Sequence, residues 1–143
     1  MTYGLKFSSR PGIWRPAPPA SQEALASLRA HAPSNLPAEY FELLAASNGG
    51  EGDLAVAPGW VALWPAEEAF ANNRGYDIEA ALPGFVGFGS NGGGELLAID
   101  MTGPPPCPVV MVPFIPMRSV ERAVIAPSFR NFLALLAIPM TGA

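Results

Sequence analysis

The sequence predicts a single α+β domain in which helices pack against a largely antiparallel sheet. The chain has 143 residues, 50% of them hydrophobic, which suits one domain with a substantial core. Apolar residues recur at helical spacing near the start and at the end of the chain, and short extended segments lie between them. Such a separation of helices from strands is typical of α+β proteins. No repeat at a fixed period and no charge-rich linker divides the chain.

Residues 1–20 are predicted to form a proline-rich arm, and residues 21–143 the domain itself. Pro11, Pro16, Pro18 and Pro19 each lack a backbone donor, so a long helix cannot form in the arm. Apolar residues alternate from residue 3 to residue 7, which suits a short edge strand or a docked arm.

The first predicted helix begins at Ser21, whose side chain can cap it, and ends at Pro33. Its apolar stripe consists of Ala24, Leu25, Leu28 and Ala32.

The second predicted helix has Pro37 at its first position and stops at Asn48-Gly49-Gly50, where glycine accepts the left-handed conformation. Its apolar residues Leu36, Tyr40, Leu43 and Leu44 recur at helical spacing.

A hairpin is predicted next, with strands at Leu54–Val56 and Trp60–Trp64 and a type II turn centred on Pro58-Gly59. Trp60 and Trp64 fall on one face of the second strand, and Val61 and Leu63 on the other. We expect a strand that is apolar on both sides to be covered on both.

The rest of the chain alternates helix and strand signals. A short helix is predicted to start at Pro65 and to stop at residues 72–75. The remaining strands are expected at Phe85–Phe88, Glu95–Asp100, Val109–Val112 and Arg122–Ile125, with Pro113 ending the third or placing it at an edge. The last helix carries Phe129, Phe132, Leu133 and Leu136 at positions i, i+3, i+4 and i+7.

Charge is distributed unevenly along the chain. The net charge is −4, but residues 31–117 carry ten acidic residues against Arg74 alone, a net charge of −9. A protein that binds nucleic acid directly needs a basic face, so this class is disfavoured. A basic protein partner fits the acidic middle of the chain better.

The stretch FVGFGSNGGGE contains G-x-G-x-x-G at Gly87, Gly89 and Gly92, a spacing that holds a dinucleotide pyrophosphate in some folds. Such a site needs a helix directly after the glycines and an acidic residue about 20 residues later. Gly103-Pro104-Pro105 leaves too little room for the helix, and residues 103–118 contain no acid. We therefore predict a hairpin turn at Asn91-Gly92 rather than a nucleotide site.

Other catalytic or metal-binding patterns are weak. His31 is the only histidine and Cys107 the only cysteine, so a zinc site, a disulfide within the chain and a serine triad all lack partners. The acid pairs Glu51/Asp53 and Asp77/Glu79 lack the remaining spacing of a calcium loop. We expect no cofactor, no metal and no enzymatic activity.

Neither a secretion signal nor an apolar segment of the roughly 20 residues that span a bilayer is recognisable. We therefore expect a soluble, cytoplasmic protein without a membrane partner.

Three segments, taken in order, resemble the SUKH superfamily, which includes yeast cell-wall-synthesis regulators and many bacterial immunity proteins. They are LPAEYFELLAASNGGEG (36–52), LPGFVGFGSNGGGELLAID (82–100) and APSFRNFLALL (126–136). The resemblance implies an α+β fold with helices against a mixed sheet, no catalytic centre, and in bacteria the binding and neutralisation of a polymorphic toxin, often one that attacks nucleic acid.

The resemblance thus implies a non-catalytic immunity protein that occludes the active site of a cognate toxin domain, for example one of a basic nuclease type. The alternative is a regulatory scaffold for an endogenous protein partner. An acidic surface would fit and steer a basic cleft. The predicted contact residues are acids around an aromatic anchor: Glu51, Asp53, Trp60, Glu67, Glu68, Asp77, Glu79 and Glu95.

Overall fold

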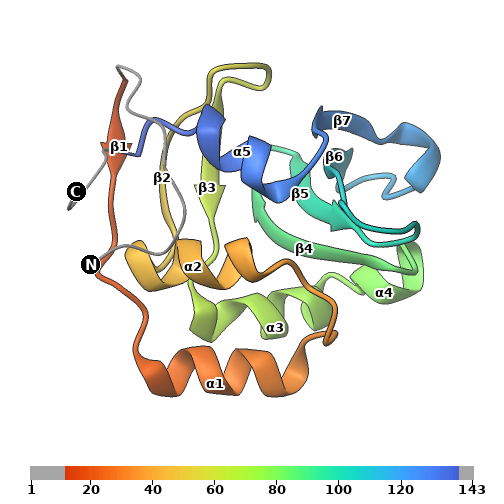
Figure 1. The fold of residues 1–143 in the computed structure, drawn as a ribbon. Helices are drawn as coiled ribbons and strands as arrows, with labels where there is room; N and C mark the ends of the chain where they lie inside the picture. Colours follow the sequence, from red (N-terminus) through yellow and green to blue (C-terminus); the bar gives the residue numbers. More distant parts are fainter. Residues whose placement is uncertain (1–11, 139–143) are drawn as a thin grey trace.

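In the computed structural model, which describes residues 12–138, each strand of the sheet neighbours those before and after it in the chain (Figure 1). All pairings between the described strands are antiparallel. The strands are β1 (Trp14–Arg15), β2 (Gly50–Asp53), β3 (Trp60–Leu63), β4 (Phe85–Ser90), β5 (Glu95–Asp100), β6 (Val109–Pro113) and β7 (Ala123–Ala126).

Helices surround this sheet, and the predicted α+β class is confirmed. They are α1 (Gln22–His31), α2 (Ala38–Ala46), α3 (Ala66–Gly75), the four-residue α4 (Ile78–Ala81), the 3-10 turn η1 (Ser119–Glu121) and α5 (Phe129–Leu135). In Figure 1, α1, α2 and α3 gather below the strands, and α5 lies in front of the middle of the sheet.

The two faces of the sheet bury separate apolar clusters. Leu97, Ile99 and Val109 belong to the larger cluster, which also takes the buried faces of α1, α2 and α5. Leu96 and Ala98, their neighbours along β5, belong to a smaller cluster on the opposite face that includes Ile78 of α4. Side chains of a strand alternate between its faces, so β5 is buried on both sides.

The first two helices follow the sequence prediction closely. The Ser21 hydroxyl accepts a hydrogen bond from the Ala24 amide at 3.0 Å, which caps α1 as expected. Pro37 is the residue before α2 rather than its first. Gly49 and Gly50, at φ +93° and +98°, end the helical segment in a backbone conformation that favours glycine.

The predicted first strand of the hairpin is wrong by several residues. Gly50–Asp53, not Leu54–Val56, pairs with Trp60–Leu63. Leu54 instead forms a bridge with Leu136 at the end of α5, and the turn is closed between Val56 and Gly59, with Gly59 as its last residue. Glycine is needed in this strand because β1 passes close to it: a Cβ at Gly52 would lie 2.5 Å from the Trp14 ring.

The β4–β5 hairpin confirms the interpretation of the glycine motif. Gly87 and Gly89 lie within β4, and Gly92, at φ +80°, lies in the turn that leads directly into β5. At Gly89 the β3 backbone passes so close that a Cβ would lie 2.6 Å from the Ala62 carbonyl oxygen. These glycines therefore shape a sheet, and a strand rather than a helix follows them.

The later elements agree with the prediction, apart from the end of α3 and the short helix α4. β6 is an interior strand between β5 and β7, so Pro113 ends it without placing it at an edge. Helix α3 continues through Gly75, and α4 was not predicted. The alternating residues 3–7 of the arm lie outside the described residues.

Candidate functional site

Strand pairing between β1, β2 and β3 brings two of the predicted contact acids next to Trp60. Asp53 lies opposite Trp60, and Glu51 lies opposite Ala62. Val61 and Leu63 of β3 are buried in the main core, so these residues occupy the other face of the sheet. The predicted cover on both sides of β3 is only partial there, since Trp60 and Trp64 remain half-buried.

Arg15 of β1 completes this group, and the sequence analysis missed it. Its guanidinium lies 3.1 Å from the Glu51 carboxylate and 5.6 Å from the centre of the Trp60 ring. The two charged side chains are 65% and 44% exposed, and ion pairs this exposed contribute only about 0–1 kcal/mol to folding. Arg15 and Glu51 can therefore separate at little cost to the fold.

The Asp53 side chain is held by the backbone just before Arg15. Its Oδ2 accepts a hydrogen bond from the Ile13 amide at 2.8 Å. The second carboxylate oxygen has no hydrogen-bond partner among residues 12–138, so it can accept from a donor outside the fold.

A second aromatic group continues along this face. Trp64 stacks on Tyr76, with ring centroids 6.0 Å apart and ring planes 12° apart, and Tyr76 lies 4.7 Å from Phe114. Tyr76 is 49% exposed. We call the combined surface the aromatic face; it consists of Arg15, Glu51, Asp53, Trp60, Trp64, Tyr76 and Phe114.

The β4–β5 turn borders the aromatic face. A Cβ on Gly92 would lie 3.4 Å from the Trp60 ring, so the turn passes beside that side chain. Glu95 follows this turn, and its carboxylate accepts a hydrogen bond from the Asn91 side-chain amide at 2.9 Å. Glu95 is thus the third predicted acid, after Glu51 and Asp53, that lies on or directly after a segment next to Trp60.

The other predicted acids are placed elsewhere. Glu67 and Glu68 lie in the first turn of α3, where Asn48 donates to Glu67 at 2.8 Å and lowers the pKa of its carboxyl. Asp77 and Glu79 line a cavity between the helices and β4. The structure therefore distributes the predicted set over three regions and does not assemble one rim.

The structure offers little to metal or nucleophilic chemistry. Within residues 12–138, no cluster of three or more His, Cys, Asp and Glu side chains could hold a metal ion. Cys107 is buried, and burial together with the nearby Asp100 raises the pKa of its thiol, which disfavours the reactive thiolate. No helix of the described part of the chain is both long and apolar enough to cross a bilayer.

Comparison with known families identifies the fold. The model of the SMI1 / KNR4 family (SUKH-1) matches residues 19–135, which is most of the chain. The chain belongs to the SMI1/KNR4 family. Members of this SUKH family are generally non-enzymatic immunity or regulatory domains. No curated protein matches the chain.

The three segments that carry the SUKH resemblance build the scaffold in this structure. They contain α2 with its glycine stop, the β4–β5 hairpin and α5. Trp60, Trp64, Tyr76 and Phe114 lie outside them. Only Glu51 belongs to both the resemblance and the aromatic face. No sequence signal could have found Arg15, because its contact with Glu51 spans 36 residues along the chain.

Proposed function

We propose that this SUKH protein is a non-catalytic, cytoplasmic binding domain that neutralises a cognate toxin domain by covering its active site. The family supports the coarser part of this proposal, a binding domain of the immunity or regulatory kind. The observation that carries the finer part is the half-buried Trp60 with Glu51 and Asp53 beside it and Arg15 over its ring.

Arg15 indicates which chemistry this place accepts. A guanidinium meets the face of an indole and a carboxylate at once, the two contacts that arginine makes best. An arginine of a basic partner can take the same place when Arg15 turns away, because the exposed Arg15–Glu51 pair is weak. Trp60 would then be the anchor, since tryptophan and arginine dominate binding energies at protein interfaces.

Charge supports a partner of this kind. A toxin domain that attacks nucleic acid needs a basic cleft for its substrate, and residues 31–117 carry a net charge of −9. Opposite fields speed association, and steered encounters reach about 10⁸–10⁹ M⁻¹s⁻¹ at low salt. Occlusion of the cleft needs no chemistry from the binding protein.

The test is neutralisation of the toxin encoded beside this gene. The toxin's C-terminal domain is co-purified with the protein, and its activity is measured with and without the protein in excess. We expect a stable complex and loss of toxin activity. Trp60→Ala should restore toxin activity, whereas Glu23→Gln, which changes an exposed acid of α1 that is not part of the aromatic face, should not.

The alternative, a regulatory scaffold for an endogenous partner, is favoured by the regulators among the relatives that the sequence resembles. It predicts that no toxin gene lies beside this one and that deletion of the gene alters growth without any toxin. If a neighbouring toxin binds this protein but keeps its full activity, the immunity role is rejected and the binding role is retained.

A further inference from the structure

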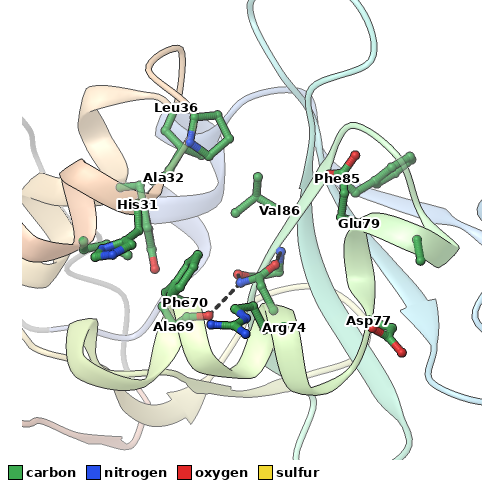
Figure 2. A pocket seen from close by; sticks show the side chains of 16 residues that line it. His31, Ala32, Leu36, Ala69, Phe70, Arg74, Asp77, Glu79, Phe85 and Val86 are labelled. Carbon is green, nitrogen blue, oxygen red and sulfur yellow. Dashed lines mark hydrogen bonds between the residues drawn. The ribbon is translucent and has the colours of Figure 1, made fainter.

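A cavity of about 680 Å³ lies between α1, α2, α3 and β4, away from the aromatic face (Figure 2). None of the seven aromatic-face residues lines it. Cavities that hold small ligands commonly measure about 300–1,000 Å³ and combine apolar walls with a few polar groups. Leu36, Phe85 and Val86 give this cavity apolar walls.

One side of the cavity carries an arginine that has no acidic partner among the described residues. The Phe70 ring lies between two nitrogen-rich side chains: the His31 ring is 4.6 Å from it, and the Arg74 guanidinium lies 5.7 Å from its centre. Arg74 makes no salt bridge with any residue of the described chain. His31 places Nδ1 2.8 Å from the Ser27 carbonyl oxygen, which can only accept, so Nδ1 carries the proton of the neutral ring and Nε2 is left as an acceptor. The positive charge at this side of the cavity therefore comes from Arg74.

The opposite side carries the opposite charge. Asp77 and Glu79 line the cavity there, and in Figure 2 they lie across Val86 from His31 and Phe70. Neither carboxylate has a hydrogen bond or an ion pair within residues 12–138. Arg74, Asp77 and Glu79 are exposed at the cavity and form no ion pair with one another, so each side of the cavity keeps its own charge.

The wall between the two ends is held rigidly. The Asn73 side chain donates to the carbonyl oxygens of Ala69 and Gly87 and accepts from the Gly87 amide, all at 2.8–2.9 Å. These bonds tie α3 to β4 across the cavity. The position of α3, which carries Arg74, is thereby fixed relative to β4.

We propose that this cavity binds a short apolar peptide with free termini, that is, a zwitterion with an apolar body. Its carboxylate would pair with Arg74, its ammonium group with the acids Asp77 and Glu79, and its side chains would lie against Leu36, Phe85 and Val86. A fatty acid would leave the two acids unmatched, and an apolar segment inside a longer chain would leave both ends unmatched.

The test uses trileucine as the probe, with calorimetry on the full-length protein. Free trileucine should bind, and amidation of its carboxylate or acetylation of its amine should each weaken binding at least about fivefold, because each cap removes a charge-assisted contact. In Arg74→Gln the penalty for amidation should vanish. In the double variant Asp77→Asn/Glu79→Gln the penalty for acetylation should vanish.

Matched controls separate this site from general charge effects. Arg29→Gln removes an arginine that also lies over an aromatic ring, 4.0 Å from the centre of Phe41, but does not line the cavity. Glu68→Gln removes an acid of α3 that does not line the cavity either. Both should retain the two penalties. Ala80→Trp, an exposed position at the cavity, should abolish binding without unfolding the protein. Absence of trileucine binding, or equal binding of the doubly capped peptide, would overturn the proposal.

Discussion

The Asn73 side chain holds the backbone of Gly87 by two hydrogen bonds, accepting from its amide at 2.8 Å and donating to its carbonyl at 2.9 Å. Gly87 lies where the register between β4 and β5 shifts, so its backbone groups are available to a side chain. An amide side chain is suited to this position because it both donates and accepts.

Asn73→Asp should destabilise the fold. The carboxylate can still accept from Gly87 but cannot donate to Gly87 or Ala69, and a partly buried acceptor left without its donor costs about 1–3 kcal/mol. Urea unfolding measures the change in the free energy of unfolding. Asn72→Asp, one residue earlier on α3, is the control, and an equal loss in both variants would contradict this role of Asn73.

Gly89→Ala should destabilise the sheet. The new Cβ would lie 2.6 Å from the Ala62 carbonyl oxygen, which belongs to the backbone of β3 and cannot turn aside. Overpacking of this kind costs about 1–3 kcal/mol. Thermal unfolding of both variants measures the effect. Gly93→Ala should be close to neutral, because a Cβ at that glycine would meet only the Asn91 side chain, at 3.5 Å. Similar losses at both positions would refute the close approach at Gly89.

Tyr40→Phe should stabilise the protein. Tyr40 is 2% exposed, and its hydroxyl has no hydrogen-bond partner in the structure, so removing the hydroxyl relieves a desolvation cost of about 1–3 kcal/mol. Burial also raises the pKa of the Tyr40 phenol, so wild-type stability should fall above about pH 10, where the unfolded chain loses this proton first. Tyr76→Phe, at an exposed tyrosine, should change neither quantity; a less stable Tyr40→Phe would show that the hydroxyl has a partner.

Glu42 should make the protein less stable as the pH rises through the acid range. Burial, and secondarily the charge of Glu39, raise the pKa of its carboxyl, while Arg130 lowers it. The folded protein therefore retains the Glu42 proton at pH values where the unfolded chain has lost it, and this contribution to stability declines above about pH 4. Glu42→Gln should remove that decline in unfolding measurements made across this range, and an unchanged pH profile would contradict the shift.

Much of the fold could be predicted because its signals are local. The Ser21 cap, the Gly49-Gly50 stop and the apolar spacing of α5 each depend on a few neighbouring residues. The exceptions are decided by distant partners. Glycine-rich β2 is a strand because it pairs with both β1 and β3. Leu54 and Ala55 bond to the end of α5, although the Leu54 amide still donates to the Gly59 carbonyl oxygen of the turn.

The candidate site was less accessible to sequence reasoning. Trp60 was predicted as the aromatic anchor of an acidic rim, and the structure places Glu51 and Asp53 next to it. The same reasoning grouped Asp77 and Glu79 with them, although these acids line a separate cavity. Acidity alone does not reveal on which surface a carboxylate lies, because that depends on how the strands pair.

The aromatic face should steer its partner electrostatically. Glu51→Gln with Asp53→Asn removes two charges, and the side-chain amide introduced in place of the Asp53 carboxylate keeps an oxygen that can accept from the Ile13 amide. Stopped-flow association with the toxin domain at low salt should slow roughly tenfold, and the difference should shrink as salt is added. Glu23→Gln with Glu121→Gln removes the same charge elsewhere, so equal slowing in both double variants would locate the contact away from this face.

The most direct test of the central claim is the dissociation constant of the complex between the toxin domain and Trp60→Ala. If Trp60 is the anchor of the interface, its loss costs at least about 2 kcal/mol of binding, which raises the dissociation constant about 30-fold. Trp60 is half-buried at the surface, so an unfolding curve recorded on the same sample confirms that the variant is folded. A folded Trp60→Ala protein that binds the toxin domain as tightly as the wild type would contradict the account.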